Sequence, residues 1–228
     1  MKRFARLFTE IDQTTKTSVK TTALSAYFTQ APDADKLWCI ALFSGRRPKR
    51  AVTTTNLREW AAERAGIPLW LLEESYPIVG DLAETIALVL PPPTQASDHS
   101  LSHWINVLRG LHEVPLVDRK PRILDAWDQL DTTERFLFNK LITGGWRIGV
   151  SQKLMTRALA QATGQDEASL AHRLMGGWTP DDVTYHSLIE AEDKAADLSR
   201  PYPFYLAYQL DDGPDPLGDP RSEERRVG

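Results

Sequence analysis

The chain has 228 residues, of which 42% are hydrophobic and 25% charged, and its formal net charge is −4. This composition is typical of a globular protein of one or two domains, and the absence of any run of 18 apolar residues excludes a membrane-spanning segment. Cys39 is the only cysteine, which excludes an internal disulfide and fits a reducing cytoplasm; we expect it to fill the core.

Helical spacing of apolar residues dominates the sequence, and strand-like alternation is almost absent. We predict an all-α fold of about twelve helices that begin near residues 2, 17, 35, 53, 68, 80, 100, 117, 131, 151, 166 and 179. Asp131 and Glu134 predict a capping box for the ninth helix. Thr179 stands before Pro180, a pattern typical of a cap and first turn, and predicts the start of the last helix.

The first 60 residues are basic although the whole chain is acidic. They contain eleven Lys and Arg against five Asp and Glu, a net of +6. Four of these cations lie in the loop SGRRPKRAVT (44–53), and TTKTSVK (14–20) adds Thr and Lys donors. A local basic patch can attract a polyanion whatever the net charge, so we predict phosphate contacts from Lys16, Lys20, Arg46, Arg47, Lys49, Arg50 and Thr53. The alternative is a solvated basic loop.

The chain also aligns with itself at offsets that fall from 100 to 98. Phe4 meets Trp104, LFSG (42–45) meets LITG (141–144), and Thr53 meets Ser151. We predict a duplication with two six-helix halves, residues 1–92 and 98–190, related by a pseudo-twofold axis. Coincidence is the alternative, because helical apolar spacing itself produces matches. A twofold axis can present both equivalent loops on one surface, which would suit the two strands of a duplex.

The loop of the second half, TGGWRIGVS (143–151), combines glycines, an arginine and a serine before a helical segment. Glycine permits positive φ and close backbone approach, serine caps helices, and helix N-termini bind phosphate. We therefore predict an anion site made of Gly144, Gly145, Arg147, Gly149, Ser151 and Lys153. The alternative is that Gly144 and Gly145 only end a helix, with Gly149 in a turn.

No catalytic set can be argued from the sequence. His99 and His103 have the spacing of a metal pair without an evident third ligand, and no phosphate-loop lysine or Ser-His-Asp set is present. We expect no metal site and no catalytic residue here. A helical protein-interaction scaffold without DNA affinity, or a small enzyme with an unrecognised site, remains an alternative.

Three segments carry a family resemblance. LITGGWRIGVSQKLMTRALAQATG (141–164) strongly resembles the signature of the N-terminal DNA-binding domain of ATP-dependent DNA ligases, most closely those of bacteria. VGDLAETIALVLP (79–91) and RPYPFYLAYQL (200–210) resemble further parts of that family, the second being its entry into the adenylation domain. The resemblance implies an all-helical, pseudo-twofold domain over 1–198 that grips nicked duplex DNA through its backbone, across the minor groove and without sequence preference. It also implies roles in DNA repair, recombination and replication.

The Lys-x-Asp-Gly motif with which such ligases attack ATP does not occur in the chain. We expect residues 199–220 to be a linker into an adenylation domain and 221–228, ending in RSEERRVG, to be a non-native tail. The resemblance thus predicts a truncated ligase: an inactive, monomeric DNA-binding fragment in the nucleoid-containing cytoplasm that binds no cofactor. ATP and Mg²⁺ are implied for the full-length enzyme.

Overall fold

The computed structural model describes residues 1–146 and 148–190, and their regular structure consists of twelve α-helices and one short 3₁₀ helix. The predicted all-α class is confirmed. Eleven of the twelve predicted starts lie within two residues of an observed one. Arg147 and the predictions for 199–220 and 221–228 lie outside the described residues. No helix in the described part is long and apolar enough to cross a membrane.

The predicted start of the last helix is wrong by six residues. Thr179 closes a turn, in which its hydroxyl donates to Asp182 Oδ2 at 2.6 Å and the Asp182 amide donates to the Thr179 carbonyl at 3.0 Å. The helix begins at Tyr185 because Thr184 and Ser187 form its capping box. A Thr with an Asp three residues later can stabilise a turn as well as a helix start.

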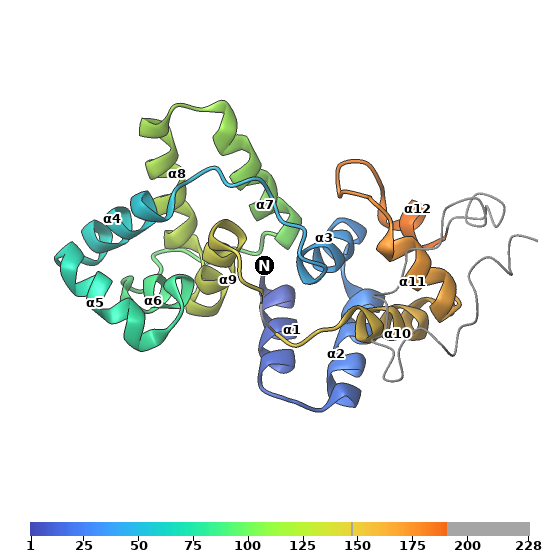
Figure 1. Cartoon of the computed structure of the whole chain (residues 1–228). Coiled ribbons are helices and arrows are strands. Elements are labelled where there is room, and N and C mark those ends of the chain that lie inside the picture. Colours follow the sequence, from blue (N-terminus) through green and yellow to red (C-terminus); the bar gives the residue numbers. More distant parts are fainter. Residues whose placement is uncertain (147, 191–228) are drawn as a thin grey trace, which may run out of the picture.

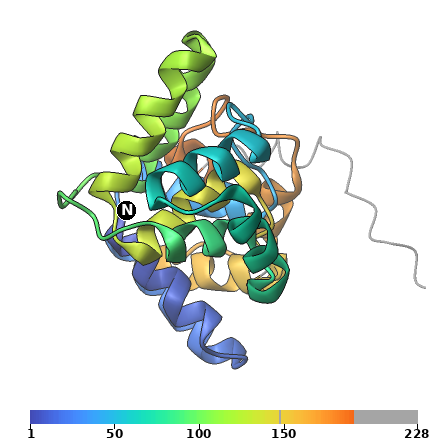
Figure 2. The same cartoon turned by 90° about the vertical axis from the view of Figure 1, so that its left-hand side faces the viewer.

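The helices form two lobes (Figure 1). The first lobe contains both ends of the described chain: α1 (Lys2–Asp12), α2 (Thr17–Gln30), α3 (Asp33–Phe43), α10 (Gln152–Thr163), α11 (Glu167–Met175) and α12 (Tyr185–Ile189). The second lobe is one continuous stretch: α4 (Thr54–Ala65), α5 (Leu69–Val79), α6 (Leu82–Val89), α7 (Leu101–Gly110), the 3₁₀ helix η1 (Leu111–Glu113), α8 (Leu116–Gln129) and α9 (Thr132–Thr143). In Figure 2, α7 and α8 project from one side of the body and the blue N-terminal helices from the other.

Within each lobe the packing joins helices that are distant in sequence. In the first lobe α10 packs on α2 and α12 on α3, and in the second α9 packs on α6 and α8 on α4. Between the lobes, α3 contacts α7 and α1 contacts α9. The buried aromatic and aliphatic side chains of both lobes belong to one hydrophobic cluster.

The predicted halves, 1–92 and 98–190, are therefore not separate bodies: each lobe takes three helices from each half. The packed pairs correspond when α1–α6 are exchanged for α7–α12, since α2 with α10 becomes α8 with α4, and α3 with α12 becomes α9 with α6. This correspondence supports the proposed duplication, whose twofold axis stays a prediction.

The chain passes between the lobes twice in the described region (Figure 1). The first crossover, residues 44–53, leads from α3 to α4, and the second crossover, residues 144–151, returns from α9 to α10. These are the two loops that the sequence singled out. Their ends are helix N-termini, where Thr53 caps α4 and Ser151 caps α10.

Candidate functional site

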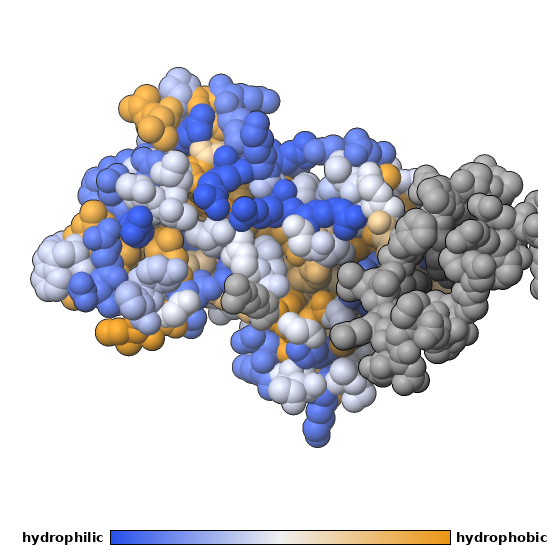
Figure 3. Space-filling view, in the orientation of Figure 1, coloured by the Kyte–Doolittle hydropathy of each residue, from blue (hydrophilic) through white to orange (hydrophobic). Residues whose placement is uncertain are grey.

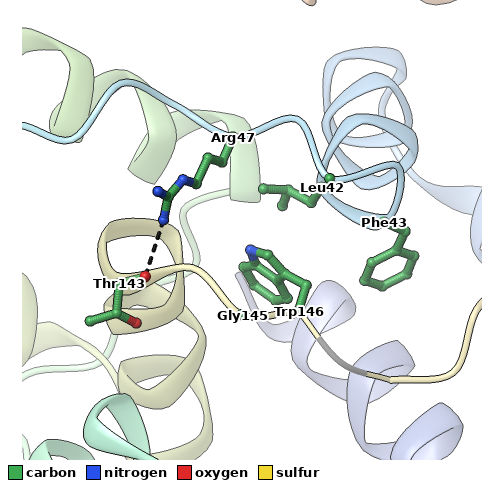
Figure 4. Close-up of a pocket in the computed structure, with 7 residues that line it drawn as sticks. Leu42, Phe43, Arg47, Thr143, Gly145 and Trp146 are labelled. Carbon is green, nitrogen blue, oxygen red and sulfur yellow. Dashed lines mark hydrogen bonds between the residues drawn. The ribbon is translucent and has the colours of Figure 1, made fainter.

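The two crossovers lie in direct contact. Arg47 of the first donates through Nη1 to the carbonyl of Thr143, the last residue of α9, at 3.0 Å, and lies against Gly144, the first residue of the second (Figure 4). A cavity of about 480 Å³ opens between them, lined by Leu42, Phe43, Gly45, Arg47, Thr143, Gly145 and Trp146. Residues some 100 positions apart thus form one surface, as the duplicated loops were predicted to do.

A second cavity of about 480 Å³ adjoins the N-terminus of α10 and shares Phe43 with the first. Its lining comes from both crossovers and from α10 and α11: Phe43, Ser44, Arg46, Ser151, Gln152, Met155, Leu174 and Met175. Ser151 accepts from the Leu154 amide at 3.2 Å, which confirms the predicted cap. The remaining amides of the first turn have no intrahelical acceptor and carry the positive end of the helix dipole.

The three glycines of the second crossover have the predicted positive φ: +81° at Gly144, +80° at Gly145 and +61° at Gly149. Gly144 is also the C-cap of α9, and its amide donates to the Lys140 carbonyl at 2.8 Å. The helix-ending alternative is therefore correct for Gly144. It leaves Gly145 and Gly149 to be explained by their surroundings.

A cation of the protein itself packs against each of these glycines. A Cβ on Gly144 would lie 2.1 Å from Arg47 Nη1, one on Gly145 would lie 3.5 Å from Lys140 Nζ, and one on Gly149 would lie 3.1 Å from Lys20 Nζ. Glycine is required at Gly144 by its backbone conformation, with φ +81° and ψ −160°, and the Arg47 guanidinium occupies the space beside it. At Gly149 an ammonium leaves little room for a side chain.

Lys20 is not a surface donor, in contrast to its place among the predicted phosphate contacts. Its side chain is 7% exposed, and Nζ donates to the Ile148 carbonyl at 2.6 Å and to the Gly149 carbonyl at 3.5 Å. Burial of a charged ammonium is costly unless hydrogen bonds compensate it. These carbonyls therefore hold Lys20 inward, where it ties α2 to the second crossover.

Lys140 holds the other end of the same segment. It is also 7% exposed; Nζ donates to the Gly145 carbonyl at 3.1 Å and forms an ion pair with Asp81, the N-cap of α6. Lys140 is not among the site residues predicted from the sequence. Its position inside the apolar run RFLFNKLI was the available signal, because a lysine on a buried helix face needs a partner.

Trp146, also missed, anchors the middle of the second crossover. Its ring lies edge to face with Phe4 at 5.8 Å, Phe8 at 6.0 Å and Phe43 at 6.4 Å between centroids. Its Nε1 is buried and has no hydrogen-bond partner among residues 1–146 and 148–190. In Figure 4 the indole stands between the crossovers, with Leu42 and Phe43 beside it.

The four cations of the first crossover differ in exposure, since one is half-buried and three are exposed. Arg46 is half-buried: Nε donates to the Trp178 carbonyl at 3.0 Å, Nη2 to the Gly176 carbonyl at 2.9 Å, and the guanidinium lies 4.3 Å from the Trp178 ring centroid. Burial lowers the pKa of Arg46 from its usual value. Arg47, Lys49 and Arg50 are exposed, and Figure 3 shows strongly hydrophilic side chains along this part of the face.

The second lobe fixes the backbone beneath these exposed side chains. Arg119 Nη1 donates to the Ala51 carbonyl at 2.5 Å, and His112 Nε2 lies 3.0 Å from the Lys49 carbonyl. Lys16 and Lys153 are exposed at the N-terminal ends of α2 and α10. The structure therefore groups the predicted residues of the two loops around two neighbouring crossovers. Lys16 lies at the start of α2, Lys20 is turned inward and Arg147 is not described.

The remaining residues considered in the sequence are His99, His103 and Cys39. His99 and His103 stack with ring centroids 3.8 Å apart, and burial lowers the pKa of His103. No three His, Cys, Asp or Glu side chains of the described region converge as metal ligands. Cys39 is fully buried as predicted, and burial raises the pKa of its thiol well above the usual value.

A family model described as DNA ligase N terminus matches residues 1–160, a range that includes both crossovers and the cavities' main walls. No curated protein matches the chain.

Proposed function

Because the chain belongs to the DNA ligase N-terminal family, we propose that it binds the sugar–phosphate backbone of duplex DNA without sequence preference. In this proposal it serves an ATP-dependent ligase that seals nicks during repair, recombination and replication. It would act as a monomer on nucleoid DNA.

The observation that carries the proposal is the contact between Arg47 and the Thr143 carbonyl, which joins the basic and glycine-rich crossovers into one surface. Both crossovers end at capped helix N-termini, at Thr53 and Ser151. Exposed cations, helix N-termini and free amides are the groups that bind phosphate irrespective of base sequence. Two such sites side by side suit the two phosphate strands of a duplex.

We assign direct phosphate contacts to the exposed side chains and the accessible backbone of this surface. The residues proposed are Lys16, Lys49, Thr53, Ser151 and Lys153, the arginines Arg47 and Arg50, and the glycines Gly145 and Gly149. Arg147 lies outside the described residues and is proposed from the sequence alone. Gly144 is left out because it is buried and its amide already donates to the Lys140 carbonyl. Arg46, which is held by Trp178 and Gly176, would contribute mainly through its charge.

We propose no ATP or Mg²⁺ site among the described residues. They contain no converging set of three metal-ligating side chains, and the whole sequence lacks a Lys-x-Asp-Gly motif. We therefore derive no nucleotidyl transfer step from this chain. In the proposed ligase, ATP and Mg²⁺ would be bound by other residues.

Fluorescence anisotropy with a labelled nicked duplex tests the proposal across salt concentrations from about 50 to 300 mM. About six phosphate contacts would give a slope of log K against log salt of roughly −5. Replacing Arg47, Lys49 and Arg50 together by Gln should reduce the magnitude of that slope by about 2.7. A protein that makes three fewer phosphate contacts releases fewer counterions from the DNA when it binds.

A triple variant with Gln at Lys2, Arg58 and Lys120 is the matched control, since each of these cations is already paired with a carboxylate. It has the same change of charge and should bind almost as the wild type does. Absence of binding at low salt would overturn the proposal and favour the protein-interaction scaffold. A duplex affinity that does not change with salt concentration would also overturn the proposal.

A further inference from the structure

In the second crossover, the backbone carbonyl groups and the backbone amide groups differ in whether they form hydrogen bonds within the protein. The carbonyls of Gly145, Ile148 and Gly149 accept from buried ammonium groups. The amides of Gly145, Ile148 and Gly149 find no acceptor among the described residues. Unpaired amides at positive-φ glycines, here Gly145 and Gly149, can bind anions.

The two ammonium groups come from different lobes. Lys140 belongs to α9 of the second lobe and grips the beginning of the crossover, while Lys20 belongs to α2 of the first lobe and grips its end. Both residues are 7% exposed. For Lys20 to meet a phosphate directly, its ammonium would have to leave the Ile148 carbonyl, 2.6 Å away.

We propose that Lys20 and Lys140 are positioning residues that turn the carbonyls of the second crossover inward and leave its amides available to a DNA phosphate. This inference rests on the proposed function. It assigns the two lysines an indirect role: they fix the conformation of the segment, and its backbone makes the contact. A binding group held by supporting hydrogen bonds loses less freedom when its ligand arrives.

Amine labelling of the wild-type chain tests the positions of the two ammonium groups. N-hydroxysuccinimide acetate is applied with and without nicked duplex, and each lysine is quantified by peptide mass spectrometry. Lys20 and Lys140 should react slowly in both states, whereas exposed Lys16 and Lys153 should react quickly and become protected by DNA. The inference would be overturned if Lys20 were labelled rapidly in the protein without DNA and slowly in the protein with DNA.

The variant Lys20→Met tests the effect on binding. Its affinity should fall about tenfold, the size of effect that lost supporting hydrogen bonds have at other sites, with an unchanged salt slope. A direct phosphate contact would instead lower the magnitude of the slope by about 0.9. Affinity is measured at a temperature at which circular dichroism shows the variant folded.

Lys120→Met is the control, because Lys120 follows Lys20 by 100 positions, the offset of the predicted duplication, but pairs with Glu63 in the second lobe. It should leave affinity and slope unchanged. Folded Lys20→Met with wild-type affinity, or with a reduced slope, would refute the positioning role. If Lys20→Met does not fold, the labelling result decides. Wild-type protein that binds no duplex would refute the proposed function instead.

Discussion

The guanidinium of Arg47 occupies the space that a side chain on Gly144 would need. A Cβ on that glycine would lie 2.1 Å from Nη1, and the same nitrogen donates to the neighbouring Thr143 carbonyl at 3.0 Å. The basic crossover and the glycine-rich crossover are thus fitted to each other at one point. A substitution at either residue should therefore alter the packing of the other.

Gly144→Ala should destabilise the fold by about 2–3 kcal/mol, because Gly144 has a backbone conformation reserved for glycine and its new methyl would collide with Arg47. Urea unfolding measures the loss. Gly164→Ala is the control: its φ is +73° but its side-chain space is open, so we expect about 1 kcal/mol. Combined with Arg47→Ala, the Gly144 change should cost less than alone; additive losses would contradict the fitted contact.

Gly149→Val should weaken duplex binding far more than it lowers the melting temperature. The valine would need φ near +61° and would push against Lys20 Nζ, which distorts the amides proposed to meet phosphate. Gly164→Val, with a similar φ and open space, should lower the melting temperature without affecting affinity. Equal losses of stability and binding in Gly149→Val would favour a purely structural glycine.

Trp146→Phe should destabilise the chain less than Trp127→Phe does. Trp146 Nε1 has no partner to lose, whereas Trp127 Nε1 donates to Asn139 Oδ1 at 2.8 Å in the core. The second substitution leaves a buried amide oxygen unsatisfied, at a cost of about 1–3 kcal/mol beyond the lost ring volume. Chemical denaturation of both variants checks the order. The reverse order would mean that Trp146 depends on a bond that the structure does not contain.

The attachment of α12 to α3 should weaken as pH rises above neutrality. His186 lies 2.8 Å from Asp33 and 3.1 Å from Glu190, and the bond to Glu190, followed by the charges of both carboxylates, raises its pKa. A raised pKa gives stability that is fully present below the unfolded value of about 6.5 and is lost as pH rises through the higher folded value.

Melting temperatures at about pH 6 and pH 8 test this dependence, because the charge of an imidazole changes in this interval. The wild type should lose stability relative to His186→Gln over that interval. A constant difference between the two proteins would show that the imidazole is not charged in the fold.

Local features of the fold were predictable because local residues determine them. The capping box of Asp131 and Glu134, the cap at Ser151 and the positive φ of the crossover glycines all appear where the sequence predicted them. The helix start predicted at Thr179 was wrong for a related reason. The same threonine hydroxyl can stabilise a turn when it donates to Asp182.

The interleaved lobes and the inward lysines were not predictable in this way. Apolar spacing shows that α2 has a buried face, but it does not say that α10 covers it. Lys20 follows Lys16 by one helical turn and looks like a second surface cation in sequence; only the position of Ile148 explains why it is buried. Trp146 is similar, because its three phenylalanine neighbours come from α1 and α3.

The order of helices in the two lobes has a consequence for synthesis on the ribosome. The stretch α4–α9 emerges as a continuous piece and can assemble as soon as it leaves the exit tunnel. The helices α1–α3 emerge first but must wait for α10–α12, more than a hundred residues later, and the closure of so long a loop is slow. Nascent chains halted before α10 should therefore expose the apolar face of α2, which makes them targets for chaperones.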